Sequence, residues 1–209
     1  MSGALHIAGE GLRKEYDRRP VFRNVSFSAS AGETLLLTGR NGSGKSTLVK
    51  VICGVLTPGG GTFTITQDPS GPLRDARGLV GLVSPYLQMF DEFSAVENLA
   101  IAMGLRGLPF DPEAADALLE RVAIFPRRHD PVRTYSSGMK QRVKYAWALI
   151  HTPPVLVLDE PMSNLDGEGI AIVRAIMAEQ RKRGILVVAT NDMADIDVYE
   201  RRVDLNDHR

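Results

Sequence analysis

A glycine-rich segment with one lysine and two hydroxyl residues is the part of this sequence best equipped for chemistry. Residues 39–47 read Gly-Arg-Asn-Gly-Ser-Gly-Lys-Ser-Thr, directly after the apolar run 34–38. Glycines let the backbone curl so that its N–H groups, with the positive end of a following helix, surround a chain of phosphates. Lys45 can then reach the β- and γ-phosphates, and the Ser46 hydroxyl can ligate magnesium. The spacing therefore predicts a nucleotide-binding phosphate loop formed by Gly39, Arg40, Asn41, Gly42, Ser43, Gly44, Lys45, Ser46 and Thr47.

Two adjacent carboxylates end an apolar run later in the chain. Residues 155–158 read Val-Leu-Val-Leu, and Asp159 and Glu160 follow them. A carboxylate at the C-terminal end of a strand next to the phosphate-loop strand stands where a magnesium shell requires an anion, and we assign Asp159 to it. Glu160 could orient, or accept a proton from, the water that attacks a γ-phosphate.

A third candidate site opens a helix. Ser136, Ser137 and Gly138 place small polar residues and free backbone N–H groups at the positive end of that helix, which favours an anion. The apolar face of the same helix consists of Met139, Val143, Ala146, Trp147 and Ile150. A serine-capped amphipathic helix is also common without any ligand. The position of this helix between the phosphate loop and the acidic pair favours the anion site.

The elements that must position these residues fall into three parts. Alternating polar and apolar residues at 5–8 and 21–28 predict antiparallel strands, with further strands at 62–66 and 79–84. From Ala95 to about Ile150 the pattern is helical, and Asp111 and Pro112 form an N-cap and first turn. The runs 155–158 and 185–189 are apolar on both faces and are joined by a helix, which indicates a buried parallel sheet.

Composition narrows the classes of protein. The chain has 209 residues, with 25 basic and 25 acidic side chains and a formal net charge of zero, so nothing electrostatic favours nucleic acid as a partner. Cys53 is the single cysteine, which excludes an intramolecular disulfide. No apolar run approaches the ~18 residues that span a bilayer, and the N-terminus lacks the apolar core of a signal peptide, so we expect a soluble protein.

The order of these motifs resembles the ATP-binding subunit of ABC transporters over nearly the whole chain. Residues 39–47 resemble the Walker A motif, residues 155–160 resemble Walker B with Glu160 as its catalytic glutamate, and residues 163–166 resemble the D-loop. Residues 135–139 stand where the family has its Leu-Ser-Gly-Gly-Gln signature, and they depart from it at three of five positions.

Three single residues follow from the resemblance. Tyr16 stands in place of the aromatic residue that stacks on adenine, although an ordinary tyrosine at a strand end would look the same. The family's Q-loop position falls on Pro85, so Gln88 is the substitute that we assign to the Q-loop and to magnesium; an exposed loop glutamine is the alternative. Asn191 replaces the switch histidine; its amide can still donate a hydrogen bond to a γ-phosphate oxygen but cannot carry a positive charge.

The resemblance implies one α/β domain over residues 1–209. It would consist of a P-loop NTPase core with a parallel sheet, an N-terminal antiparallel β portion and a helical subdomain inserted at about residues 95–135. The resemblance also implies Mg²⁺-dependent ATP hydrolysis by two subunits, in a homodimer or heterodimer, that close face to face. Each ATP would lie between one Walker A loop and the partner's signature helix.

A separately encoded transmembrane permease, which we expect to be an exporter, would hold this cytoplasmic subunit at the inner face of the cell membrane.

Two other classes of protein share part of this pattern. A small-molecule kinase would share the phosphate loop but would not need residues 135–139 or 163–166. A non-transport ABC-type ATPase, acting in DNA repair or translation, would usually carry a long coiled-coil insertion or a second cassette, and this sequence shows neither.

Overall fold

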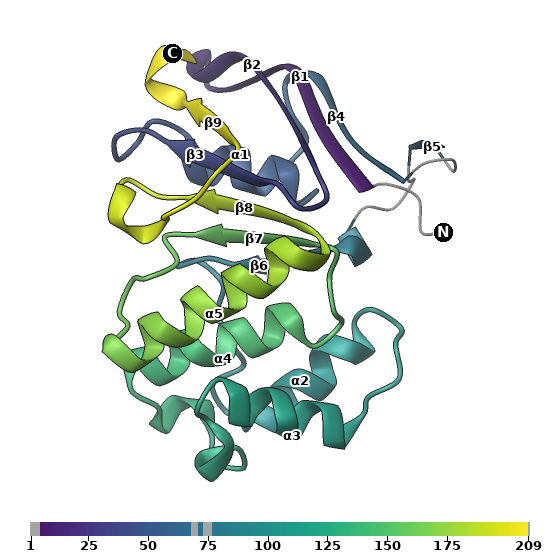
Figure 1. The fold of residues 1–209 in the computed structure, drawn as a ribbon, viewed down its shortest axis with the longest axis vertical. Coiled ribbons are helices and arrows are strands. Elements are labelled where there is room, and N and C mark those ends of the chain that lie inside the picture. The colour runs from purple at the N-terminus through teal and green to yellow at the C-terminus, as the bar shows by residue number, and fades with distance from the viewer. Residues whose placement is uncertain (1–4, 68–70, 73–76, 209) are drawn as a thin grey trace.

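Two β-sheets of different kinds carry the fold (Figure 1). In the computed structural model, which describes residues 5–67, 71–72 and 77–208, one sheet is parallel with strand order β6-β7-β8-β3-β9, and the other is antiparallel with order β2-β1-β4-β5. The parallel strands are β3 (Thr34–Thr38), β6 (Val80–Val83), β7 (Val155–Asp159), β8 (Ile185–Ala189) and β9 (Arg201–Asp204). The antiparallel strands are β1 (Leu5–Tyr16), β2 (Arg19–Ser30), β4 (Gly60–Gln67) and β5 (Gly71–Pro72). The α/β class predicted from the sequence is confirmed.

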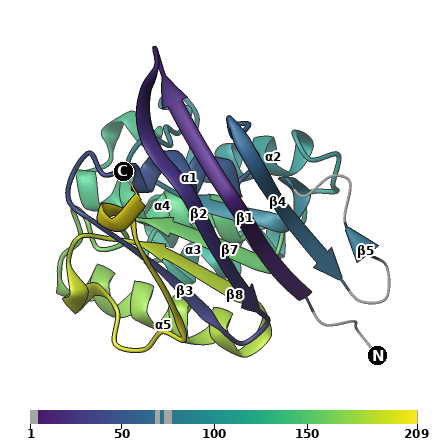
Figure 2. The ribbon, with the colours of Figure 1, turned by 90° about the horizontal axis from the view of Figure 1, so that it is seen from above.

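Helices cover the parallel sheet and fill the space between the sheets. They are α1 (Lys45–Ile52), α2 (Ala95–Gly104), α3 (Pro112–Arg121), α4 (Ser137–Leu149) and α5 (Gly167–Arg183). Short 3₁₀ turns are η1 (Arg77–Leu79), η2 (Phe125–Arg127), η3 (Val132–Thr134), η4 (Met193–Asp195) and η5 (Leu205–His208). Figure 2 shows the antiparallel sheet lying across the parallel sheet, with α1 beneath it.

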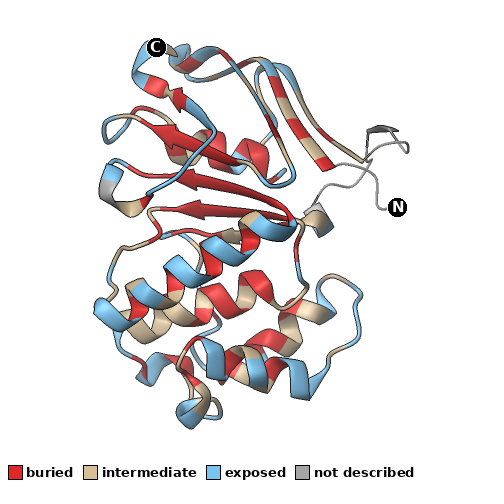
Figure 3. Ribbon diagram, in the orientation of Figure 1, coloured by how far each residue is buried: buried red, intermediate tan, exposed pale blue. Residues whose placement is uncertain are grey.

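Alternate residues of the central strands pack into two separate cores. Leu156 and Leu158 of β7 pack with helices α2 to α5, whereas Val155 and Val157 pack with α1 and the antiparallel sheet. Successive side chains of a strand point to opposite faces, so a strand covered on both faces must be apolar throughout. Figure 3 shows the result as continuous burial along β3, β7 and β8. This sheet is a rigid platform for the residues at its carboxyl end.

The segment between β6 and α4 is helical, as the sequence predicted. Ser94 caps α2 through a reciprocal pair of hydrogen bonds with Glu97, and Asp111 caps α3 with Pro112 in the first turn. The two helices pack against each other and against α4. The expected domain range 1–209 includes residues 1–4, 68–70, 73–76 and 209, which lie outside the described residues.

Candidate nucleotide-binding site

The phosphate loop leaves the carboxyl end of β3 and leads into α1. Three of its glycines, Gly39, Gly42 and Gly44, have φ of 141°, 76° and 105°, in a region that L side chains rarely adopt, and Gly39 and Gly44 are also crowded. A Cβ on Gly39 would lie 2.5 Å from Ser43 Oγ, and a Cβ on Gly44 would lie 2.8 Å from Val21. The tight curl that concentrates backbone N–H groups here therefore depends on these glycines.

The side chain of Lys45 lies at the floor of a hollow beside this loop. Its ammonium donates a hydrogen bond to Gly39 O at 2.7 Å and lies 3.7 Å from Glu160 Oε1, and the side chain is only 6% exposed. The hollow has a volume of about 360 Å³, and its lining residues are Val21, Asn41, Gly42, Gly44, Lys45, Ser46, Thr47, Pro85, Tyr86 and Glu160. A buried cation on a concave surface is suited to a phosphate chain.

Asp159 lies at the end of β7 and is almost completely buried. Burial raises the pKa of its carboxyl, while a hydrogen bond from Ser46 and the charge of Lys45 oppose that rise. Ser84 Oγ lies 3.4 Å from Oδ2, but Oδ1 has no hydrogen-bond partner among the described residues. A buried, unpartnered carboxylate oxygen is costly, so it fits a site that a cation completes.

A magnesium ion fits this corner of the site. Ser46 and Asp159 offer hard oxygen ligands, which Mg²⁺ prefers. Within residues 5–67, 71–72 and 77–208 no group of three or more His, Cys, Asp or Glu side chains could hold a metal ion. The remaining ligands would therefore come from water and from phosphate oxygens.

Glu160 turns out of β7 with an unusual backbone. Its φ is 51°, and its N–H donates to Ala189 O at 2.8 Å. Burial raises the pKa of its carboxyl; Lys45 opposes this rise, and Asp159 and Asp195 add to it. A non-glycine residue held in this region is characteristic of functional sites, and the turn directs the carboxylate towards Lys45.

Asn191 lies at the end of β8, beside the phosphate loop. Its Nδ2 donates to Asn41 Oδ1 at 3.2 Å, so segments 150 positions apart in the chain meet here. Asn191 is not among the residues that line the hollow. Contact with a γ-phosphate remains a prediction.

The residue predicted for the Q-loop, Gln88, lies apart from the hollow. Gln88 is exposed and does not line it; Pro85 and Tyr86 stand there instead. Lys144 holds this segment to α4 by donating to the carbonyls of Ser84 and Pro85. The structure therefore does not bring Gln88 to the hollow, because the loop presents Pro85 and Tyr86 to the phosphate loop.

Tyr16 ends β1 at the tip of the β1–β2 hairpin, where Asp17 and Arg18 both have positive φ. Its ring is 50% exposed, lies outside the set of residues lining the hollow, and has Lys14 Nζ at 5.4 Å from its centroid. An exposed ring can offer a stacking face, and its role towards adenine stays a prediction.

The signature segment begins α4 at the edge of the molecule where β3, β7 and β8 end (Figure 1). Ser136 caps the helix by accepting from Met139 N, and Ser136 and Ser137 are exposed. A Cβ on Gly138 would lie 3.2 Å from Asn164 O, so glycine allows α4 to begin against residues 163–166. None of the three signature residues Ser136, Ser137 and Gly138 lines the hollow of its own chain.

Sequence reasoning missed two groups that contact the turn at Glu160. Thr190 is fully buried and lies within reach of both Glu160 and Asp195. Tyr145 of α4, also fully buried, donates its hydroxyl to Pro161 O at 2.7 Å. For Tyr145 the sequence offers one signal, a side chain with a hydroxyl group at a core-facing position of α4.

The fold and this site define a class of protein. A parallel sheet with a phosphate loop after one strand, and an Asp-Glu pair after a strand of the same sheet, is the architecture of a P-loop nucleotide-binding ATPase domain. The sequence matches the ABC transporter family over residues 22–163, and the chain belongs to this family. Members of the family hydrolyse ATP.

Individual relatives agree with this assignment. The chain is 35% identical to the uncharacterized ABC transporter ATP-binding protein YxlF of Bacillus subtilis, over 89% of this chain and 62% of that protein. It is 33% identical to the cytochrome c biogenesis ATP-binding export protein CcmA of Nitrosococcus oceani (94% and 90% covered) and 32% identical to the arginine transport ATP-binding protein ArtM of Bacillus subtilis (90% and 81%). The chain thus spans less than two thirds of YxlF.

A solved structure of an ATP-binding subunit of an ABC transporter superposes with a TM-score of 0.79 at 27% identity, covering 94% of this chain and 87% of that one. Across the described ranges, no helix combines the length and apolar character needed to cross a membrane.

Proposed function

We propose that this chain binds Mg²⁺-ATP and hydrolyses it to power transport through a separate membrane-spanning partner. The observation that carries the proposal is the buried Lys45, whose ammonium lies 3.7 Å from the Glu160 carboxylate at the floor of the phosphate-loop hollow. A group that binds phosphates and a group that can take a proton are thereby brought together in a partly water-excluded place.

The chemistry follows from what each residue can do. Lys45 and the loop N–H groups hold the phosphates in line, and Glu160 accepts a proton from the water that attacks the γ-phosphorus, which leaves ADP and phosphate. Bound Mg²⁺, held by Ser46 and Asp159, would neutralise negative charge on the phosphates. Asn191 lies next to the loop and can donate an amide hydrogen bond to a γ-phosphate oxygen.

The signature residues support action as a pair of subunits. Ser136, Ser137 and Gly138 lie outside the hollow of their own chain, at a helix end whose N–H groups favour anions. A second subunit placed face to face would bring these residues to the ATP of the first. ATP would then hold the two subunits together, and hydrolysis would release them.

An exposed aromatic patch supports docking of the membrane partner. Phe90 and Phe93 are each 45% exposed, their ring centroids lie 6.2 Å apart, and Trp147 lies 6.2 Å from Phe90. Tyr86, which lines the hollow, is on the same loop. Because this patch adjoins the nucleotide site, a membrane partner bound to it could sense whether nucleotide is present.

We propose export as the direction of transport, supported by the similarity to the export protein CcmA, and we propose that the chain lies at the inner face of the cell membrane.

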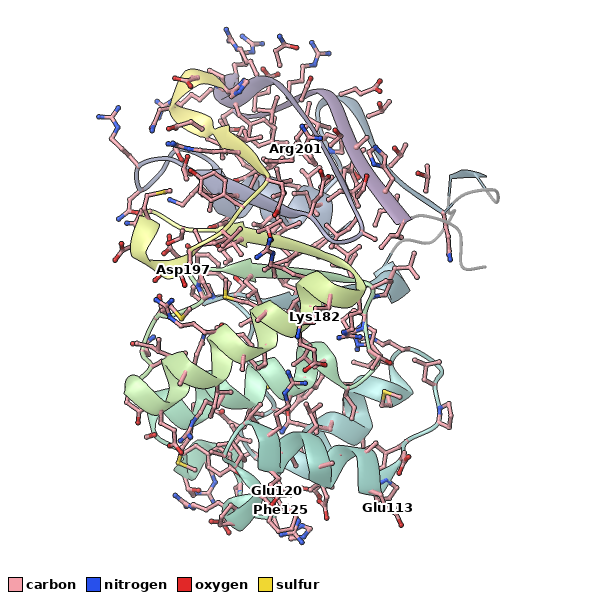
Figure 4. All side chains as sticks on the ribbon, in the orientation of Figure 1. Glu113, Glu120, Phe125, Lys182, Asp197 and Arg201 are labelled. Atoms are coloured by element: carbon pink, nitrogen blue, oxygen red, sulfur yellow. The ribbon has the colours of Figure 1, made fainter. Side chains whose placement is uncertain are left out.

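Titration with a fluorescent ATP analogue tests the proposal. Lys45→Ala should lose most of the binding, because a charge-assisted contact with the phosphates is removed. The matched control is Lys182→Ala, an exposed lysine on α5 (Figure 4), which should bind as the parent does. Equal affinity of Lys45→Ala and the parent would refute nucleotide binding at this loop.

Two further measurements separate the other parts of the proposal. Glu160→Gln should form a dimer on size-exclusion chromatography with ATP but not with ADP; a monomer in both would leave only a heterodimer or an obligatory membrane partner. Phe90→Glu should abolish co-purification with the membrane-spanning partner while leaving ATP binding intact. If Phe90→Glu still co-purifies, the patch is not the docking site.

A further inference from the structure

The two carboxylate oxygens of Glu160 have different neighbours. Oε1 faces Lys45 Nζ at 3.7 Å, whereas Oε2 lies 3.4 Å from Thr190 Oγ1. Thr190 is fully buried at the residue that follows β8, next to Asn191. The amide of Asn191 donates to Asn41 on the phosphate loop. The hydroxyl of Thr190 is therefore a neutral polar group that lies against the carboxylate of Glu160.

The Thr190 hydroxyl carries one proton and has three polar neighbours besides Glu160. Asp195 Oδ2 lies at 2.6 Å, Asp192 N donates to Oγ1 from 3.0 Å, and Asp192 O lies at 3.3 Å. A hydroxyl has one donor proton and two acceptor lone pairs. The shortest contact is with a carboxylate, which makes a charge-assisted hydrogen bond with the proton. Glu160 at 3.4 Å is at the far limit of hydrogen bonding.

The segment that carries Asp195 is fixed from the outside. Asp195 ends η4, and Asp197 just beyond it pairs with Arg174 of α5 at 2.6 Å. Figure 4 labels Asp197 near the edge where the parallel strands end. Three chain segments, at the ends of β7 and β8 and in η4, thus bring Glu160, Thr190 and Asp195 into one row.

We propose that Asp195 is a positioning residue that acts through Thr190. By attracting the Thr190 proton at 2.6 Å, Asp195 leaves Oε2 of Glu160 with only a long contact of 3.4 Å from that hydroxyl, and hence with a lone pair open to another proton. Oε2 can then take a proton of the attacking water, whose oxygen forms the new bond to the γ-phosphorus through a lone pair and keeps the electrons of the broken O–H bond. The bond from the γ-phosphorus to the β,γ-bridging oxygen breaks, and its electrons leave with ADP. This inference rests on the proposed ATP hydrolysis and adds residues that hold its base.

The test uses an interaction between two substitutions. In Asp195→Ala the Thr190 proton is free to turn to Glu160, which weakens the base, so kcat should fall roughly tenfold or more with KM unchanged. Thr190→Val removes that proton and should cost less. In the double variant Asp195→Ala/Thr190→Val the proton is absent, so its kcat should recover towards that of Thr190→Val. Such recovery is not expected from two independent structural losses, which would add.

Controls separate this role from folding and from the proposed function. Glu120→Ala removes an exposed acid of α3, far from Thr190 in the chain, and should retain the parent kcat. Thr190→Ser keeps the hydroxyl and should retain more of the rate than Thr190→Val. Asp195→Asn, of equal size, should show an intermediate loss and serves if Asp195→Ala does not fold. A double variant no faster than Asp195→Ala would overturn the inference alone. A parent rate equal to that of Glu160→Gln would overturn the proposed hydrolysis as well, and the two failures are distinguishable.

Discussion

Tyr145→Phe is a substitution of one oxygen that should reach the proposed catalytic turn from the signature helix. The Tyr145 hydroxyl is fully buried and donates to Pro161 O at 2.7 Å, one residue after Glu160. Burial raises the pKa of this hydroxyl far above its ordinary value, so it remains a donor at every working pH. In Tyr145→Phe the buried Pro161 carbonyl loses this partner.

The magnitude follows from leaving a buried acceptor unsatisfied. Such a loss costs about 1–3 kcal/mol of unfolding free energy. For a chain of this size each kcal/mol lowers the melting temperature by roughly 2–4 °C, so a decrease of roughly 2–12 °C is expected. The turn at Glu160 has a positive φ and needs support from its surroundings. Phosphate release should therefore slow as well, while ATP binding, which depends on Lys45, should be unchanged.

Thermal unfolding followed by circular dichroism measures the first effect, and steady-state phosphate release at saturating ATP measures the second. Tyr86→Phe is the matched control, because Tyr86 is 68% exposed and its hydroxyl makes no hydrogen bond to a carbonyl of the described residues. It should melt with the parent. If Tyr145→Phe melts and turns over as the parent does, the hydroxyl does not support the turn and the reasoning is refuted.

Three further predictions concern separate features. Asn191→Ala should lower the rate of phosphate release ~10²–10³-fold, because a positioned hydrogen-bond donor is lost. Asn191→His should release phosphate as fast as the parent or faster, with Glu160→Gln as the blank. An unchanged rate in Asn191→Ala would contradict the role of Asn191. Gly81→Ala places a Cβ 2.4 Å from Ala148 O and should lower the free energy of unfolding, measured in urea, by about 1–3 kcal/mol. An unchanged urea midpoint would mean that β6 and α4 can move apart at little cost. Burial lowers the pKa of His151 from 6.5 to about 4, so on acidification the unfolded chain binds the proton before the folded chain does. The free energy of unfolding should therefore fall as the pH drops below 6.5, and urea unfolding at pH 7 and pH 5 should show a smaller fall in His151→Gln than in the parent. An identical fall would exclude this cause.

Local signals in the sequence predicted much of the fold. The apolar runs of β3, β7 and β8 are read directly, because strands covered on both faces must be apolar throughout. The caps at Asp111 and Ser136 also act within a few residues, so spacing alone locates the helix starts. The strand β9 was missed, since its residues 201–204 are largely charged and only Val203 is buried.

The candidate site divides in the same way. The phosphate loop and the Asp159-Glu160 pair depend on neighbours in the chain, and the structure brings them together. The structure places Pro85 and Tyr86, and not Gln88, at the hollow. This depends on how the loop after β6 lies on α4, and the spacing of residues in the sequence does not determine it. The contact of Thr190 with Glu160 joins the ends of two strands, and no local pattern marks it.

The position of β3 in the sheet has a consequence for the order of folding. The strand that leads into the phosphate loop lies between β8 and β9, and its pairing partners begin at Ile185, about 150 residues further along the chain. Contacts of such long sequence separation form slowly, because the intervening loop must first be closed. A chain emerging from the ribosome therefore carries its phosphate loop on an unpaired strand until nearly all of it has been synthesised. Nucleotide would then bind only the finished sheet and would stabilise it by mass action.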